Sequence, residues 1–232
     1  MDEFKVEKFL KGLSGDDRKI ASVIIENTIH IDDNYMFELL NKALDEFELL
    51  VPKYNLFIPD NKIGSEHYLI SKVCHRLKPS KCFYGTIPDN DYPILIIDDA
   101  IYSSCNMCSI IDELMEKGMS EKKFYCVVAI TSSVNCDVKK MFAADIIAGL
   151  NLEHLTVEKL IPDYSSDRMY NLFGCETYCV LPVFFDHKIA NAFGSYQFYY
   201  RVIKKPIDRS PINIITEDDI QKIADSFKVN IF

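Results

Sequence analysis

Hydrophobic residues in the first part of the chain recur every three or four positions. This spacing occurs in residues 4–13, 20–25 and 36–50, and it predicts three helices that each have one apolar face. Pro52 follows the third stretch and ends it, because proline lacks the N–H that the helical hydrogen-bond pattern needs. We therefore expect a helical N-terminal extension over residues 1–52.

Beyond residue 52, short apolar runs alternate with helical patterns. The strand-like runs are 54–58, 82–84, 94–97, 124–130, 146–148 and 178–185. Several are apolar at every position, which is typical of parallel strands covered by helices on both faces. Helices are predicted between them at 65–77, 107–117 and 134–141. The pattern indicates an α/β fold, a parallel sheet flanked by helices, over residues 53–205.

The end of the chain has a different pattern. Residues 193–202 are rich in aromatic side chains, and residues 218–227 have helical spacing. We expect residues 206–232 to form a C-terminal tail with a closing helix.

Charge and composition argue against some classes of binding partner. The 232 residues carry a formal net charge of −9, which argues against a nucleic-acid surface or an anionic-membrane surface. No apolar run approaches the roughly 20 residues that span a membrane. The acidic, amphipathic start is unlike a signal peptide, so we expect a cytoplasmic protein with reduced cysteines. The oligomeric state stays open.

The segment from Ile94 to Ile111 holds the clearest chemistry. A buried strand is followed by Asp98 and Asp99, then by a polar turn and a helix. In open α/β sheets ligands bind at the carboxyl ends of strands, and the free N–H groups at a helix start hold anions. The carboxylates would take sugar hydroxyls or Mg²⁺. The alternative is a plain strand end with Ser104 or Asn106 capping the helix.

This segment resembles the phosphoribosyl-pyrophosphate loop of phosphoribosyltransferases with the type I fold. That loop has an apolar strand, two acidic residues and a short turn rich in Ser, Thr and Gly. The resemblance implies that Asp98 and Asp99 contact ribose hydroxyls and Mg²⁺. It also implies that the turn binds the 5′-phosphate through Tyr102, Ser103, Ser104, Cys105 and Asn106. Ser104 stands where the family has glycine, and none of the 8 glycines lies in this turn.

Two further segments fit the same resemblance. Lys62, Gly64 and Ser65 occupy the position of the family's pyrophosphate loop, although Ser65 alone would equally be a helix N-cap. Asp186, His187 and Lys188 follow an apolar strand. They resemble the C-terminal segment of a divergent phosphoribosyltransferase-like family found in bacterial conflict systems and large DNA viruses. The resemblance makes Asp186 and His187 ligand-binding residues and Lys188 a catalytic residue beside Asp98 and Asp99. The alternative is a solvated turn.

The expected function is binding of a phosphorylated ribose or nucleotide, with Mg²⁺-dependent transfer at ribose C1. A non-catalytic nucleotide-sensing or interaction module of the same fold is the alternative, because of Ser104. A third interpretation is a thioredoxin-like oxidoreductase, since Cys105 and Cys108 form a Cys-x-x-Cys at a helix start. A zinc site in which Cys105 and Cys108 combine with Cys175 and Cys179, or with His187, is a weaker alternative. The histidines at 30, 67, 75 and 154 are predicted to be surface or capping groups.

Overall fold

The computed structural model describes residues 3–13, 15–59, 65–83, 88–102, 105–132, 142–162 and 182–186. These residues form two compact units. The first contains the described residues up to Met36, together with Ser132, 152–162 and 182–186, and the second contains those in 37–131 and 142–151. Within these ranges, no helix has both the length and the apolar character needed to cross a membrane.

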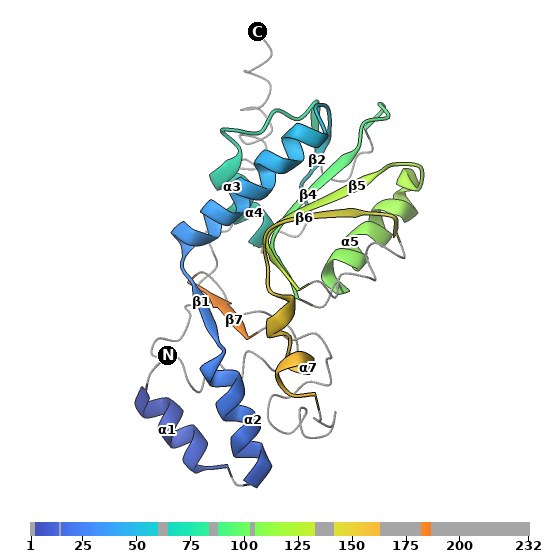
Figure 1. The fold of residues 1–232 in the computed structure, drawn as a ribbon. Coiled ribbons are helices and arrows are strands. Elements are labelled where there is room, and N and C mark those ends of the chain that lie inside the picture. Colours follow the sequence, from blue (N-terminus) through green and yellow to red (C-terminus); the bar gives the residue numbers. More distant parts are fainter. Residues whose placement is uncertain are drawn as a thin grey trace. The chain divides into compact units, whose positions relative to one another are not determined.

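The second unit is an α/β unit built on a five-stranded parallel sheet with strand order β3-β2-β4-β5-β6. Figure 1 shows the strands with their helices. The elements are β2 (Asn55–Phe57), α4 (Ser65–Val73), β3 (Lys81–Phe83), β4 (Ile94–Ile101), α5 (Cys105–Leu114), a π-helical turn η1 (Met115–Met119), β5 (Phe124–Thr131) and β6 (Asp145–Asn151). Helix α3 (Asp33–Leu50) starts in the first unit and continues through the second. The predicted α/β fold with a parallel sheet is confirmed.

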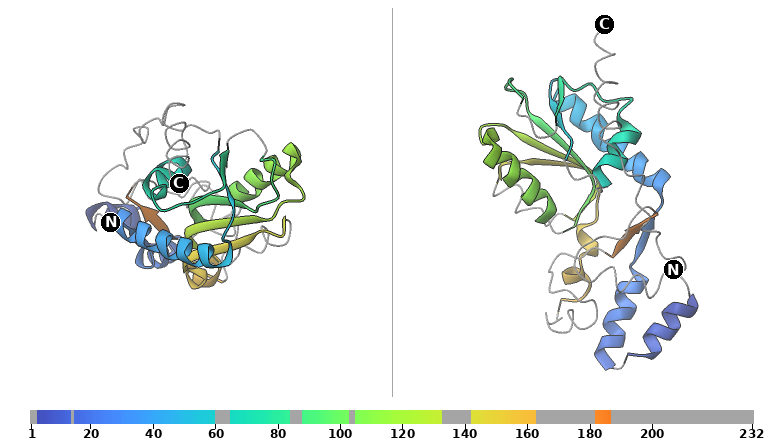
Figure 2. Two further views of the ribbon diagram at one scale, coloured as in Figure 1. Left: turned by 90° about the horizontal axis from the view of Figure 1, so that it is seen from above. Right: turned by 180° about the vertical axis from the view of Figure 1, so that it is seen from behind.

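Helices cover both faces of this sheet. Helix α5 packs through Met107 and Ile111 on the face that carries Ile96 and Cys126. Helix α3 covers the other face, where the ring of Phe47 contacts Tyr54 and Tyr125. Figure 2 shows α3 and α5 on opposite sides of the strands. All eight residues of β4 are buried, which explains why its run has no polar alternation before Asp98.

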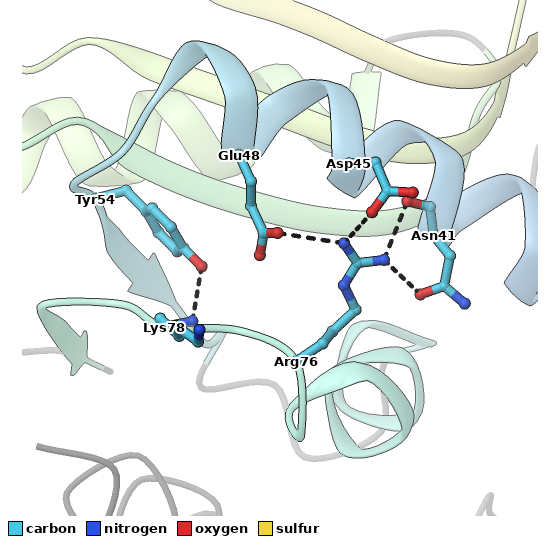
Figure 3. A network of polar contacts seen from close by, with 6 residues as sticks. All are labelled: Asn41, Asp45, Glu48, Tyr54, Arg76 and Lys78. Carbon is cyan, nitrogen blue, oxygen red and sulfur yellow. Dashed lines mark hydrogen bonds and ion pairs between the residues drawn. The ribbon is translucent and has the colours of Figure 1, made fainter. Parts of the chain in front are cut away.

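Arg76, which follows α4, binds a group of polar side chains on α3 (Figure 3). Nη1 of Arg76 donates to the carbonyl oxygen and to Oδ1 of Asn41, at 3.1 and 2.9 Å. Its Nη2 pairs with the carboxylates of Asp45 and Glu48, and the Arg76 side chain is only 19% exposed. Burial lowers the pKa of Arg76, but the two carboxylates outweigh it and the pKa lies above its usual value. One side chain therefore holds about two turns of α3, from Asn41 to Glu48.

Removing this side chain should destabilise the second unit. Arg76→Ala leaves two carboxylates without their shared cation, and we expect the free energy of unfolding to fall by about 1–3 kcal/mol. Urea unfolding measures this change. Lys117→Ala is the control, because it removes an exposed ion pair between η1 and Glu113, four residues earlier, and should cost well under about 1 kcal/mol. Equal effects in the two variants would contradict a structural role for Arg76.

Helix α3 also touches strand β6 at a glycine. A Cβ atom added to Gly149 would lie 2.1 Å from the carbonyl oxygen of Leu39. The carbonyl oxygen of Gly149 accepts a hydrogen bond from Lys42 Nζ at 3.0 Å. The backbones of helix and strand are thus in direct contact, and any side chain at position 149 would separate them.

Gly149→Ala should therefore be strongly destabilising. The methyl group meets backbone atoms that cannot move aside, so we expect a loss of about 3 kcal/mol in the free energy of unfolding. Thermal and urea unfolding measure it. Gly12→Ala is a matched control, since its nearest atom, the carbonyl oxygen of Phe9, is 3.3 Å from the added Cβ. A stable Gly149→Ala variant would show that the helix and strand are not held this closely.

The first unit contains a second, two-stranded sheet. Its elements are α1 (Glu3–Lys11), α2 (Gly15–Glu26), β1 (Ile29–Ile31), the 3-10 turn η2 (Glu153–Leu155), α7 (Val157–Leu160) and β7 (Val183–Phe185). Strands β1 and β7 are parallel, and His30 lies opposite Phe184 with its ring stacked at 4.6 Å. Strand β1 was not predicted, because three residues between two helices show no periodicity.

Other boundaries differ by a few residues. Helix α4 ends at Val73 rather than 77, α3 starts at Asp33 rather than 36, and α5 ends at Leu114. The predicted helix to Lys117 changes into the π-helical turn η1 after Leu114, and Gly118, where the helix was predicted to stop, has a φ of 91°. The predicted helix at 134–141, the aromatic segment and the C-terminal tail lie outside the described residues. The predicted boundaries at 52 and 205 remain predictions.

Candidate functional site

Between β2 and β4 the sheet has a point of strand reversal, where the chain changes the side of the sheet toward which it adds strands. From β2 the chain proceeds to β3 on one side, whereas from β4 it proceeds to β5 on the other. In open parallel sheets the carboxyl ends of two such strands flank a crevice in which ligands bind. Helix α4 follows β2 and helix α5 follows β4, so the first turns of both helices lie at this edge. The strand β4 and the helices α4 and α5, which contain residues predicted to bind the ligand, all meet at this edge.

Asp98 and Asp99 lie inside β4 rather than after it. The predicted strand ends at Ile97, but the strand extends to Ile101, and Asp98 lies opposite Val128 of β5. The two residues are 4% and 0% exposed. The N–H of Asp99 donates to Oδ1 of Asp98 at 2.8 Å. Two carboxylates are therefore built into the central strand.

The two carboxylates point to opposite faces of the sheet, because side chains alternate along a strand. Asp98 shares the face of Ile96 and Cys126, and its charge adds to burial in raising the pKa of the Cys126 thiol.

This arrangement bears on the predicted Mg²⁺ site. Among the described residues, no group of three or more His, Cys, Asp and Glu side chains is placed to hold a metal ion. Mg²⁺ usually keeps several waters and binds one or two carboxylates together with phosphate oxygens of a substrate. Mg²⁺ held by Asp98 or Asp99 together with a phosphate of the ligand therefore remains a prediction.

Two buried residues at the start of α4 were not identified from the sequence. Glu66 is 8% exposed and His67 is 2% exposed, so of the surface or capping role predicted for His67 the surface role is wrong. Oε1 of Glu66 accepts a hydrogen bond from Nδ2 of Asn106 at 3.5 Å. Asn106 is exposed on the first turn of α5. This contact joins the two helix starts that flank the point of strand reversal.

The other predicted residues of this region are only partly placed. Tyr102 directly follows β4 and is half-buried. Ser65 and Cys105 are the first residues of α4 and α5. The predicted positions outside the described residues are Lys62, Gly64, Ser103, Ser104, His187 and Lys188.

Asp186 belongs to the first unit and has partners there. Its Oδ1 lies 2.6 Å from Nε2 of His30, and its Oδ2 accepts the N–H of Asp33 at 3.3 Å. The carboxylate thereby links β1, the end of β7 and the first residue of α3. Its predicted role in ligand binding remains a prediction, and the contacts give it a structural role.

The described thiols are embedded in the fold. Cys126 is fully buried, and burial raises its pKa well above the usual range. Burial also raises the pKa of Cys82, to about 12. Cys108 is half-buried against the apolar cluster under α5. The side chain of Cys105 lies outside the described residues, so the thioredoxin-like interpretation remains a prediction.

The buried thiol of Cys126 should resist alkylation in the folded protein. At pH 8 a thiol with a strongly raised pKa has almost no thiolate, which is the reactive form, so Cys126 should stay unmodified in the folded protein. A short iodoacetamide pulse followed by mass spectrometry measures this, with the urea-unfolded protein as the control. Rapid labelling of Cys126 in the folded protein would contradict its burial.

Comparison with known proteins gives no family for this chain. No protein-family model matches it, and no curated protein matches it.

Proposed function

We propose that the protein binds a phosphorylated ribose or a nucleotide at the edge formed by β2, β4, α4 and α5, in the manner of a phosphoribosyltransferase-like protein. One observation carries the proposal. The strand with two adjacent carboxylates, Asp98 and Asp99, ends beside the point of strand reversal, where α/β sheets bind ligands.

The two helix starts differ in charge. Helix α5 has no acidic residue in its first turn, whereas α4 has Glu66 there. The N–H groups at a helix start attract anions, and a nearby carboxylate weakens that attraction. We therefore assign the phosphate end of the ligand to α5. The carboxylates of β4 then accept hydrogen bonds from the sugar hydroxyls.

The proposed reaction is substitution at C1 of the ribose. A nucleophile forms a bond to C1 and releases its proton to solvent, the bond from C1 to the pyrophosphate oxygen breaks, and pyrophosphate leaves with the electron pair. Bound Mg²⁺ supplies neutralisation of charge on the leaving group. The contribution of the chain is to orient the sugar through Asp98, Asp99 and the start of α5.

A non-catalytic module of the same fold is the second candidate. Ser104 replaces the glycine of the family's loop, and a side chain there hinders close approach of the backbone to a phosphate. Release of pyrophosphate from phosphoribosyl pyrophosphate, tested with a panel of bases, separates the two candidates. Binding without release identifies the module.

Ligand binding should stabilise the protein. We expect phosphoribosyl pyrophosphate with Mg²⁺ to raise the melting temperature of the wild type, and to shift the Asp98→Asn/Asp99→Asn variant much less relative to its own ligand-free value. Thermal shift and calorimetry measure both. The control is Asp112→Asn/Glu113→Gln, which removes the same charge from exposed positions of α5. No stabilisation of the wild type would overturn the proposed function.

A further inference from the structure

Two half-buried cysteines lie at the two ends of the connection between α4 and β3. Cys74 is the first residue after α4, and Cys82 is the middle residue of β3. The carbonyl oxygen of Cys74 accepts a hydrogen bond from the N–H of Leu77 at 3.2 Å, so the chain turns directly after the first thiol. Only residues 75–81 separate the two cysteines, and they begin with this turn.

Both cysteines lie on the face of the sheet that α3 covers. The side chain of Phe83 packs in the apolar cluster under α5, and side chains alternate along a strand, so Cys82 points to the opposite face. On that face α4 lies beside α3, with the ring of Tyr68 5.8 Å from the ring of Phe37. Cys74 at the end of α4 is therefore on the same side of β3 as Cys82.

Charge effects place the two sulfurs close together. Burial raises the pKa of the Cys82 thiol to about 12, and the negative charge of a Cys74 thiolate is the second cause. Burial likewise raises the pKa of Tyr54 to about 12, with smaller contributions from the charges of Glu48 and Cys82. The ring of Tyr54 packs on Phe47 of α3, which again puts Cys82 on the α3 face. Coulombic effects weaken with distance, so Cys74 and Cys82 are neighbours.

We propose that Cys74 and Cys82 form a reversible disulfide that fastens strand β3 to the end of α4 when a peroxide is present. The bond would act on a weakly supported strand, because β3 has three residues and, among the described strands, pairs only with β2. Arg76, which binds α3, lies inside the loop that the disulfide closes. The proposal is independent of the ligand under the proposed function.

The oxidation has two steps. The thiolate of Cys74 attacks one oxygen of hydrogen peroxide, so that an S–O bond forms, the O–O bond breaks, and hydroxide leaves and takes up the thiol proton as water. The thiol of Cys82 then attacks the sulfenic acid sulfur, an S–S bond forms, the S–O bond breaks and a second water leaves. The two thiols lose two electrons, and the peroxide is reduced to two water molecules. Cys82 is assigned the second step because a thiol with a raised pKa holds little thiolate for the first.

Peptide mapping tests the bond in the folded protein. Reduced wild type is treated with hydrogen peroxide at low protein concentration, its remaining thiols are alkylated, and it is digested without reductant. Trypsin cuts after Arg76 and Lys81, so the two cysteines fall on separate peptides. Mass spectrometry should find these peptides joined, and dithiothreitol should release them. The melting temperature of the oxidised protein should lie about 5 °C above that of the reduced protein, because closing the loop restricts the unfolded chain.

Three serine variants test the assignment of the residues. Cys74→Ser and Cys82→Ser should each lose the joined peptides and the rise in melting temperature. Cys108→Ser is the matched control, because it removes another half-buried thiol and should keep both. In Cys82→Ser, dimedone should trap a sulfenic acid at Cys74, whereas in Cys74→Ser it should trap none at Cys82. Circular dichroism checks that each variant is folded.

The wild-type map decides the proposal even where a variant does not fold. Peroxide treatment that leaves the two peptides separate, or that joins Cys74 or Cys82 mainly to other cysteines, would overturn the disulfide. Joined peptides with an unchanged melting temperature would show that the bond does not fasten β3. Trapping of a sulfenic acid at Cys82 in place of Cys74 would reverse the order of the two steps.

Discussion

The second unit depends on one demanding feature, a central strand that carries two carboxylates into a buried position. Strand β4 pairs on both sides, with β2 and β5, and its eight residues are all buried. Burying a carboxylate costs free energy unless hydrogen bonds or charges compensate it. The Asp99 N–H supplies one such bond to Asp98. Proteins retain costly arrangements of this kind mostly where they serve binding or catalysis.

The strands could be predicted where burial on both faces requires apolar residues at successive positions. The apolar runs of β4 and β5 show no alternation of apolar and polar residues, because helices cover both faces of the sheet. This pattern predicted the parallel sheet. Strand β1 escaped prediction because its partner β7 lies some 150 residues further along the chain, and three residues carry no period.

The candidate site was predictable only in part. The acidic pair was visible because it interrupts an apolar run, but the end of the strand was placed too early, since pairing with β5 continues past Asp98. Glu66 looked like an ordinary acidic residue in the first turn of a helix. Its burial and its contact with Asn106 depend on how two helices meet at the sheet edge, and no local pattern encodes that meeting.

The glycine at position 149 has a consequence for helix α3 as a whole. Because the backbone of Leu39 lies directly against Gly149, rotating the helix about its axis would break this close contact. The same rotation sets which residues of α3 face Arg76, namely Asn41, Asp45 and Glu48. Gly149 and Arg76 thus both depend on the rotation of α3 about its axis. In a double-mutant cycle, the changes in the free energy of unfolding for Gly149→Ala and Arg76→Ala would therefore not add, and the difference is a coupling energy.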